Sequence, residues 1–376
     1  MLPRPEQARI VRGAVLNTIG ADTPYAESQP LSIDEIRLES PKDGEVLVRI
    51  DAAGICHSDL SVVNGSRPRP VPMLLGHEAS GLIEELGPGV ENLSLGQRVV
   101  LTFLPRCGQC PACNESGGKL PCVAGAQSNE LGILLTGGSR LTRHGRPVAH
   151  HLGVSAFAEH AVVDARSVVP VGDDVPADIA AVLGCAVLTG GGALLNAARI
   201  TAESRVAIVG LGGVGMAGLL TALAYDCKEV IAIDAQNNKL DLALEWGATA
   251  AYTPQRAVDR QVTADVVLEA VGHPAAFETA AQILGLGGTL VTVGLPKPGE
   301  TAQIEPLSLT AKAQSIVGSY LGSAIPSRDI PIFEELWRSG KLPLENLISG
   351  HIALDEINTA MDDLASGRVL RQIINF

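Results

Sequence analysis

Two patterns of hydrophobic and polar positions divide the chain near residue 181. Before it, short alternating runs, such as residues 45–50, 79–86 and 158–163, are separated by turns rich in glycine and proline. This spacing predicts an antiparallel, partly barrel-like β domain. Beyond it, short apolar runs alternate with segments of helical period, which predicts an α/β fold built on a doubly wound parallel sheet.

The second region repeats strand and helix several times. We expect its strands at residues 205–209, 229–233, 265–270, 289–293 and 316–318, with helices at 237–246 and 274–284 and an apolar helix ending near 224. Two amphipathic helices, 328–339 and 355–367, precede a last strand at 370–375. Since 376 residues exceed one ordinary core, two domains are expected.

Composition narrows the class of protein. The chain carries 28 basic and 41 acidic residues, a net charge of −13, which argues against nucleic acid and acidic membrane surfaces as partners. Aromatic residues make up only 3% of the chain, so an aromatic stacking platform is not expected. We find no long apolar run and no apolar signal core at the N-terminus, and therefore expect a cytoplasmic protein without a transmembrane helix.

Three separated residues suggest a catalytic metal site. Cys56, His77 and Cys185 offer two thiolates and one imidazole, a ligand set that suits zinc. Three protein ligands leave the fourth tetrahedral position open for substrate, as in catalytic zinc sites. The alternative is three buried side chains without a metal, since free cysteine is among the most buried residue types.

A compact cysteine cluster is the strongest local motif. Cys107, Cys110, Cys113 and Cys122 can close around one ion, which predicts a structural zinc lobe at about residues 105–123. An iron–sulfur cluster uses similar spacing but would need redox chemistry elsewhere in the chain. Cys227 is left over and is interpreted as a small, buried apolar residue.

Histidines gather in the segment 123–153, which we expect to form a loop or hairpin. They are His144, His150 and His151. We interpret them as solvated or hydrogen-bonded loop residues rather than metal ligands.

A glycine-rich turn between a strand and a helix predicts a dinucleotide site. Its cofactor-binding residues are Gly210, Gly212, Gly213, Val214 and Gly215, with Asp234 at the end of the next strand. Glycines there allow a tight turn, close approach to the pyrophosphate, and helix–strand packing. Asp234 would accept hydrogen bonds from the adenosine ribose and repel a 2′-phosphate, so NAD is favoured over NADP. Val271 and Val293 follow later strands and could approach the cofactor through their backbones.

Together these motifs resemble the zinc-dependent medium-chain alcohol dehydrogenases over nearly the full chain. The resemblance rests on Cys56-His57-Ser58-Asp59, Gly76-His77-Glu78, the cysteine cluster, Gly184-Cys185 and the glycine turn with Asp234. It implies a GroES-like catalytic domain from residues 1–186 and 320–376, and an NAD-binding Rossmann domain from 187–319. It also implies an active site in the cleft between them.

The resemblance assigns further roles. Ser58 would take the proton of the alcohol, and Glu78 would lie behind the zinc ligated by Cys56, His77 and Cys185. Asp59 would orient His77. The remaining positions concern the cofactor: His57 and Arg371 at the pyrophosphate, and Lys239 near the adenosine ribose.

Two departures from the family stand out. Eight residues separate Cys113 from Cys122, where seven are expected, and Ser61 replaces the histidine that ends a proton relay in the animal enzymes. Either His57 serves instead or protons leave through water. The long segment 123–153 resembles the dimeric branch, so a homodimer is expected.

The expected function is reversible, NAD-linked oxidation of a primary, secondary or benzylic alcohol, with two zinc ions per chain. Phe103 and the segment 68–74 are candidates to line the substrate pocket. One alternative is a thiol-linked formaldehyde dehydrogenase acting on S-(hydroxymethyl)glutathione or a similar adduct. An alternative of another class is a nucleotide-binding protein that kept the fold and lost the chemistry.

Overall fold

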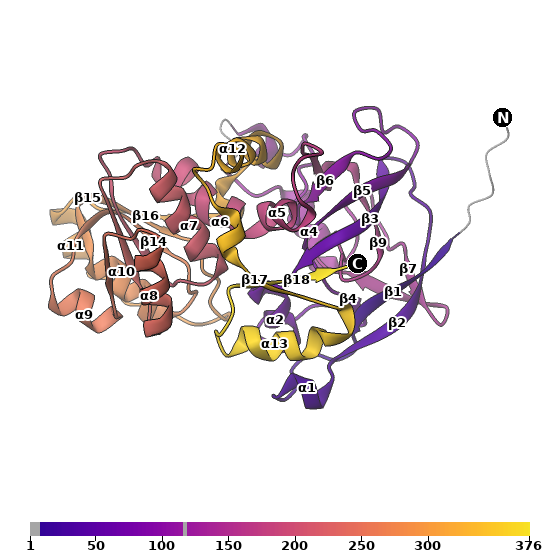
Figure 1. Cartoon of the computed structure of the whole chain (residues 1–376), viewed down its shortest axis with the longest axis horizontal. Coiled ribbons are helices and arrows are strands. Elements are labelled where there is room, and N and C mark those ends of the chain that lie inside the picture. Colours follow the sequence, from indigo (N-terminus) through magenta and orange to yellow (C-terminus); the bar gives the residue numbers. More distant parts are fainter. Residues whose placement is uncertain (1–7, 116–118) are drawn as a thin grey trace. The chain divides into compact units, whose positions relative to one another are not determined.

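The computed structural model describes residues 8–115 and 119–376, which divide into two compact units (Figure 1). The first unit comprises Met1–Asn114, Pro121–Cys185 and Ile348–Phe376. The second comprises Glu115–Leu120 and Ala186–Leu347. Residues 1–7, and residues 116–118 of the expected zinc lobe, lie outside the described residues.

The first unit is mainly β-structure. Its strands are β1 (Arg9–Leu16), β2 (Leu31–Leu38), β3 (Glu45–Gly54), β4 (Met73–Leu74), β5 (Glu78–Leu86), β6 (Arg98–Leu101), β7 (Leu141–Arg143), β8 (Arg146–His150), β9 (His160–Asp164), β10 (Val168–Pro170), β17 (Ile348–Ile352) and β18 (Arg371–Asn375). Its helices are α1 (Tyr25–Ser28), α2 (His57–Val63), α3 (Pro111–Asn114), α4 (Val123–Leu131), η1 (Ala165–Ser167), α5 (Ala177–Val182), η6 (Leu354–Glu356) and α13 (Ile357–Ala365).

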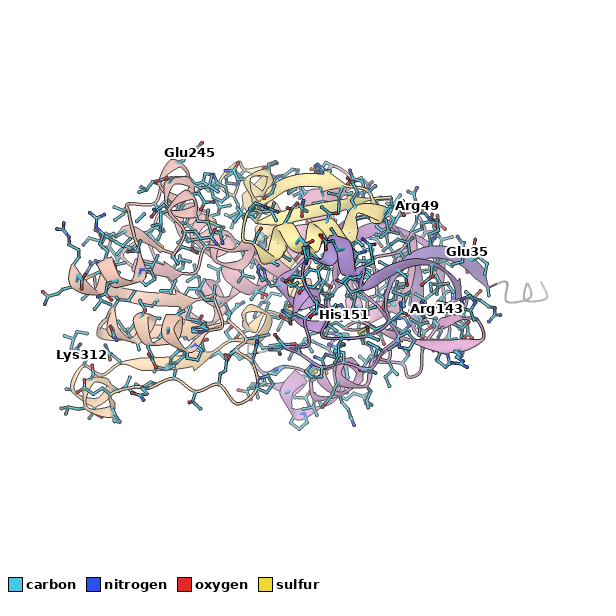
Figure 2. All side chains as sticks on the ribbon, turned by 90° about the horizontal axis from the view of Figure 1, so that it is seen from below. Glu35, Arg49, Arg143, His151, Glu245 and Lys312 are labelled. Carbon is cyan, nitrogen blue, oxygen red and sulfur yellow. The ribbon has the colours of Figure 1, made fainter. Side chains whose placement is uncertain are left out.

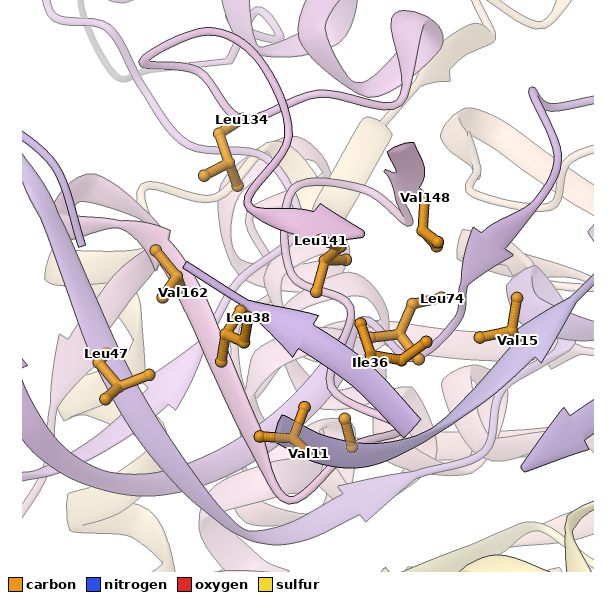
Figure 3. Packing of buried hydrophobic residues seen from close by; sticks show 11 residues of the cluster. Val11, Val15, Ile36, Leu38, Leu47, Leu74, Leu134, Leu141, Val148 and Val162 are labelled. Carbon is orange, nitrogen blue, oxygen red and sulfur yellow. The ribbon is translucent and has the colours of Figure 1, made fainter. Parts of the chain in front are cut away.

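Five strands of this unit close into a barrel in the order β1-β2-β7-β8-β4, within the described residues. Figure 3 shows the apolar side chains that fill it. They include Val11, Val15, Ile36, Leu38, Leu74, Leu141 and Val148, each at most 2% exposed. The segment 123–153 supplies the β7–β8 hairpin of this barrel, as expected, and also α4, which the sequence pattern did not predict.

A second sheet of the first unit follows the order β10-β6-β5-β3-β18-β17, with β9 also paired to β3. The last strand, β18, runs antiparallel to β3, so that Ile373 lies opposite Gly54. Both ends of the chain therefore build the same unit, as the resemblance implied.

The second unit alternates strands and helices. Its strands are β11 (Arg205–Val209), β12 (Glu229–Ile233), β13 (Ala250–Tyr252), β14 (Ala264–Glu269), β15 (Leu284–Thr292) and β16 (Ser315–Gly318). Its helices are α6 (Leu188–Gly192), η3 (Ala193–Ala198), α7 (Gly213–Ala224), α8 (Asn237–Glu245), α9 (Pro254–Asp259), α10 (Pro274–Gln282), α11 (Pro306–Ala311), η4 (Tyr320–Ser323), α12 (Pro326–Arg338) and η5 (Leu344–Leu347). A further helical turn, η2 (Leu183–Val187), spans the boundary between the units.

The strands of the second unit form a parallel sheet in the order β13-β12-β11-β14-β15-β16, among the residues described. The direction of strand addition reverses between β11 and β14. Ligands of such sheets bind beyond the carboxyl ends of the strands at this reversal. The prediction of a Rossmann sheet in one unit and a barrel-like β fold in the other is confirmed.

One expected boundary differs. We placed residues 320–347 with the catalytic domain, but they group with the second unit. The reason is packing: Phe333 of α12 is fully buried, and a side chain at Gly191 of α6 would lie only 2.6 Å from its ring. Asn196 also donates to the buried Asp329 of α12 at 3.0 Å.

The expectation that the chain contains no long apolar segment was also wrong. Ala177–Ala198 is a helical stretch of 22 residues whose most apolar 18-residue window has a mean hydropathy of 1.8, so it is long and apolar enough to cross a membrane. However, 83% of its most apolar window is buried inside the protein. Such burial is typical of the core helix of a folded domain.

Candidate metal centres and dinucleotide site

Cys56, His77 and Cys185 come together in the first unit although they are far apart in sequence. Cys56 caps the N-terminus of α2, His77 precedes β5, and Cys185 lies in η2. Their ligand atoms all lie within 4.8 Å of one another, and all three residues are buried. Cys185 Sγ is 3.5 Å from His77 Nε2. A tetrahedral zinc with ordinary bond lengths would place these two atoms about 3.6 Å apart, so the residues fit the ion.

The buried carboxylate of Asp59 organises this group. Asp59 Oδ1 lies 3.1 Å from His77 Nδ1, while Oδ2 accepts the backbone amide of Cys56 at 3.0 Å. Burial alone would raise the pKa of Asp59, but the imidazoles of His77 and His151 outweigh it and lower the pKa below its usual value. One carboxylate therefore caps α2 and orients the His77 ring, leaving Nε2 to face Cys185.

His151 is a second imidazole on the same carboxylate. Its Nδ1 lies 3.1 Å from Asp59 Oδ1, and its ring meets that of His77 edge-on with centroids 5.3 Å apart. In Figure 2 His151 lies among the ribbons of the first unit, whereas the exposed Glu245 and Lys312 lie at the outside of the second. Nothing in the sequence pattern indicated that His151 shares a partner with His77. The parallel pairing of β4 with β8 brings it there.

Glu78 and Arg371 form a buried ion pair beside the same group. Arg371 Nε lies 3.0 Å from Glu78 Oε1, and both side chains are at most 2% exposed. Burial raises the pKa of Glu78 to about 7, although the charge of Arg371 acts in the opposite direction. The guanidinium also donates to the carbonyl of Ile55 at 2.9 Å. Arg371, which the resemblance placed at the cofactor pyrophosphate, thus pairs with Glu78 within the protein.

The other expected catalytic residues lie at the start of α2. His57 is exposed and Ser58 is partly buried. Ser61, in the position of the missing relay histidine, donates its hydroxyl to the carbonyl of His57 at 2.7 Å. Phe103 contacts the His77 ring edge-on at a centroid distance of 5.5 Å. An apolar ring thus covers one side of the candidate metal site.

The four clustered cysteines also converge. Their sulfurs lie within 4.8 Å of one another, with Cys107 Sγ 3.9 Å from Cys113 Sγ and Cys110 Sγ 4.0 Å from Cys122 Sγ. A zinc with four thiolates would require sulfur separations of about 3.8 Å. The four residues therefore fit a zinc ion, and the eight-residue gap before Cys122 does not keep it from the group.

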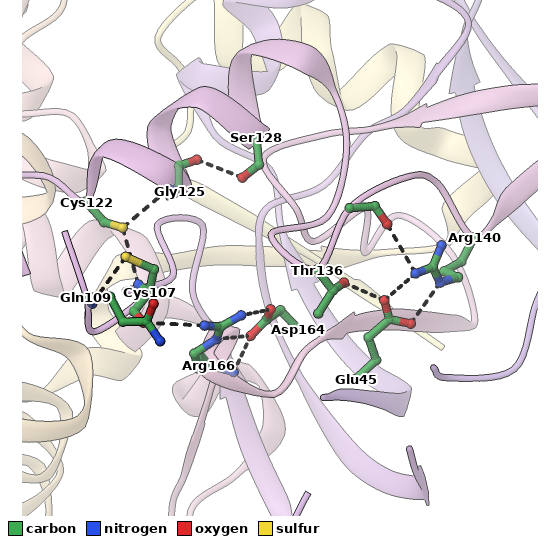
Figure 4. A network of polar contacts seen from close by, with 11 residues as sticks. Glu45, Cys107, Gln109, Cys122, Gly125, Ser128, Thr136, Arg140, Asp164 and Arg166 are labelled. Atoms are coloured by element: carbon green, nitrogen blue, oxygen red, sulfur yellow. Dashed lines mark hydrogen bonds and ion pairs between the residues drawn. The ribbon is translucent and has the colours of Figure 1, made fainter. Parts of the chain in front are cut away.

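Backbone donors surround these sulfurs, as Figure 4 shows. Cys122 Sγ accepts the amides of Cys107 and Gly125, both at 3.3 Å. A hydrogen bond from the backbone of Val123 is the main cause that lowers the pKa of Cys110 to about 6. Such donors favour thiolates, the form that binds metal. Cys227 lies apart from both groups, with its thiol 3.4 Å from the carbonyl oxygen of Thr201.

The glycine turn of the second unit has the geometry that its sequence predicts. Gly210 has a φ of +93°, and a side chain at Gly215 would lie 1.8 Å from the Gly210 carbonyl oxygen. At Gly212, by contrast, a side chain would meet nothing within 4 Å. Gly213 and Val214 then open α7. The turn therefore leaves free space above its backbone, beside a helix N-terminus that favours phosphate.

Asp234 is tied to this turn. Its carboxylate accepts the amide of Leu211 at 2.7 Å and that of Gln236 at 2.9 Å. Lys239 is partly buried in the following helix, α8. Val271 and Val293 lie just past the ends of β14 and β15, where the parallel sheet presents its carboxyl edge. All the expected cofactor residues except His57 and Arg371 thus belong to the second unit.

Known proteins resemble this chain over nearly its whole length. Residues 42–173 match the family model of the alcohol dehydrogenase GroES-like domain, and residues 213–338 match that of zinc-binding dehydrogenases. Alcohol dehydrogenase B of Mycobacterium tuberculosis is 34% identical over 360 residues, which cover 93% of this chain and 96% of that protein.

Solved structures agree with these matches. The alcohol dehydrogenase zinc-binding domain protein of Burkholderia ambifaria has a TM-score of 0.92 and 33% identity, over 98% of this chain and 100% of that one. Benzyl alcohol dehydrogenase of Acinetobacter calcoaceticus has a TM-score of 0.90 and 32% identity, over 98% of this chain and 99% of that one. The chain belongs to the zinc-dependent medium-chain alcohol dehydrogenases, oxidoreductases that act on small alcohols and their carbonyl products.

Proposed function

We propose that this protein is an NAD-linked alcohol dehydrogenase that oxidises a benzylic or other small alcohol at a zinc held by Cys56, His77 and Cys185. The observation that carries the proposal is the convergence of these three buried ligand atoms, with Asp59 supporting His77. Three ligands leave one coordination position for a substrate oxygen. A zinc ion there supplies Lewis acidity that lowers the pKa of the alcohol.

The protein's own residues complete the site. Ser58, at the start of α2, is positioned two residues from Cys56 to take the alcohol proton, and His57 is exposed to pass it to solvent. Glu78 and Arg371 hold a buried charge pair next to the ligands. Cys107, Cys110, Cys113 and Cys122 would bind a second zinc that stabilises their lobe.

NAD is the proposed cofactor, with hydride transfer to its nicotinamide ring. The turn at Gly210–Gly215 would hold the pyrophosphate, and Asp234 would accept hydrogen bonds from the ribose hydroxyls. Among the described residues, the carboxylate of Asp234 is hydrogen-bonded by backbone amides and pairs with no cation that could bind a 2′-phosphate. Lys239, Val271 and Val293 would complete the cofactor contacts.

Aromatic alcohols are the favoured substrates. The related Acinetobacter enzyme acts on benzyl alcohol, and Phe103 covers His77 with an apolar ring in this chain. One observation favours the thiol-linked formaldehyde alternative: the buried Nε of Arg69 has no hydrogen-bond partner among the described residues. A carboxylate of a thiol adduct could supply that partner.

A homodimer in the cytoplasm is also proposed. Strand β16 forms an edge of the second unit's sheet, and an unpaired edge offers backbone donors and acceptors to a second copy. Leu286 and Leu307, 79% and 71% exposed in this unit, would gain from burial.

The direct test is NADH formation across benzylic, primary, secondary and polyol alcohols, with NAD or NADP, and with a thiol plus formaldehyde. We expect zinc-dependent turnover of benzyl alcohol with a preference for NAD. Turnover only with the thiol adduct would support the alternative. Zinc-loaded, folded protein that oxidises nothing in this panel would contradict the proposal.

A further inference from the structure

Glu269 is a buried acid that the site described above does not use. It is the last residue of β14 and is 1% exposed. Strand β14 flanks the position where the sheet order reverses. The side chain therefore lies at the carboxyl edge where ligands of such sheets bind.

Glu269 holds two separate loops through five hydrogen bonds. Its Oε1 accepts the amides of Val271 at 2.8 Å and Gly272 at 2.7 Å, while Oε2 accepts the Thr292 hydroxyl at 2.7 Å. Its backbone carbonyl accepts the amides of Val293 at 2.9 Å and Gly294 at 3.2 Å. One residue thus fixes the backbone that follows β14 and the backbone that follows β15.

The loops are packed too closely to adjust independently. A side chain at Gly294 would lie 2.1 Å from the Gly272 amide nitrogen and 2.8 Å from Glu269 Oε2. A side chain at Gly210 would lie 2.4 Å from a methyl carbon of Val271. The glycine turn therefore rests against the loop that Glu269 holds, and a shift of that loop reaches the turn.

Burying the Glu269 carboxylate costs free energy, and among the described residues no cationic side chain forms an ion pair with it. All its recorded partners are neutral donors on the two loops and on β15. Neutral donors compensate a buried charge only when each is held at good geometry. The presence of a buried acid at position 269 is therefore explained better by the loop conformation that it fixes than by a contribution to the free energy of folding.

We infer that Glu269 is a positioning residue that presents the backbones of Val271 and Val293 to the nicotinamide half of the cofactor. This inference rests on the proposed NAD-linked function. Without the carboxylate, two partly buried amides and one hydroxyl lose their partner, and the loops can take other conformations. A variant without this carboxylate should therefore bind the cofactor more weakly while it still folds.

The experiment compares full-length, zinc-loaded variants by NADH fluorescence titration, by the KM for NAD against kcat, and by thermal unfolding. Thr292→Val removes one hydrogen bond and should raise the NADH dissociation constant about 5-fold. Glu269→Ala leaves three donors unpaired and should raise it by more than about 10-fold. Glu269→Gln can accept the two amides and donate to Thr292, so it should restore binding to within about 2-fold.

Thr221→Val is the matched control. The Thr221 hydroxyl is buried, whereas that of Thr292 is partly buried, and it donates to the Ala217 carbonyl at 2.8 Å within α7 and away from both loops. This variant should lose thermal stability much as Thr292→Val does, with unchanged NADH affinity. If Glu269→Ala does not fold, the two threonine variants decide the question.

Equal NADH affinity in the wild type, Thr292→Val and Glu269→Ala would overturn the inference alone. So would an equal loss of affinity in Thr292→Val and Thr221→Val, since the effect would then follow stability. A wild-type protein that binds no NADH would overturn the proposed function, and the inference with it.

Discussion

The two cysteine-containing groups of this chain differ in almost every physical respect. Cys107, Cys110, Cys113 and Cys122 lie within one short segment, three of them partly exposed, and their sulfurs accept backbone amides from the same lobe. Cys56, His77 and Cys185 come from three separate segments and are buried, with Asp59 behind them. The first group offers four ligands and the second only three.

This difference separates a site that serves folding from one that serves chemistry. A local group of four thiolates uses every coordination position, so its ion can only stabilise the loop around it. A group of three needs the finished fold to assemble it, and keeps one position for a substrate. The consequences of breaking each group should therefore differ in kind.

The largest effect is expected from Cys56→Ser. Removing one of the three ligands should reduce alcohol oxidation to background. This decrease in activity is larger than the roughly 100-fold decrease that follows when a residue that only supports a ligand is lost. Thermal stability and NADH affinity should change little. Steady-state kinetics and calorimetry measure both, with Cys227→Ser as the cysteine control outside either group. Retained turnover in the variant would refute the ligand assignment.

Cys110→Ser should act on stability instead. Loss of the lobe zinc is expected to lower the free energy of unfolding by about several kcal/mol, because the binding of a structural zinc contributes free energy to folding. Turnover per folded molecule should remain measurable. Urea unfolding with and without added zinc tests this, and a variant as stable as the wild type would argue against a structural ion in the lobe.

Asp59→Asn should weaken the second group, Cys56, His77 and Cys185, without removing a ligand. The amide cannot balance the two imidazoles of His77 and His151, so zinc affinity at this site should fall about 10- to 100-fold. The rate of zinc loss to a chelator measures this directly, and His151→Gln should show a smaller change in the same direction. Unaltered rates in both variants would mean that the carboxylate does not support the ligand.

The smallest expected effect concerns pH. Burial, with the charge of Arg140, lowers the pKa of His150 from 6.5 to about 3. Between these values the unfolded chain binds a proton that the folded chain does not, so stability falls as the pH drops below 6.5. At about pH 5.5 this amounts to roughly 1.4 kcal/mol.

His150→Gln removes this pH dependence while keeping an acceptor for the Arg140 amide, which His150 Nε2 accepts at 3.2 Å. Urea unfolding at neutral pH and near pH 5.5 should therefore show a smaller loss of stability in the variant. Equal losses in both proteins would show that His150 is not the group responsible.

The sequence was sufficient to predict the features that depend on residues close together in the chain. The thiolate spacing of the lobe and the glycine turn with Asp234 are readable because each motif is contained in one segment. The three members of the second group were also singled out from the sequence, since few other residues offer soft thiolates, and the structure brings them together. Most of the strands and helices expected in the second unit lie within a few residues of their expected ranges, whereas β13, α9 and α11 were not expected.

What the sequence could not reveal depends on contacts between distant segments. The pairing of His151 with Asp59 requires the β4–β8 register, and residues 320–347 join the second unit because Phe333 packs at Gly191. Glu269 looks like an ordinary strand end until the backbone of Gly272 is seen to close on it. Tertiary packing decides each case, and residue periodicity carries no information about it.

Native mass spectrometry of the zinc-loaded wild type and of Cys56→Ser, with benzyl alcohol oxidation followed in the same samples, tests the central claim most directly. We predict two zinc ions and NAD-dependent turnover for the wild type, against one zinc ion and no turnover for the variant. Two ions in the variant, or turnover by a chain that carries one, would contradict the assignment of the catalytic zinc to Cys56, His77 and Cys185.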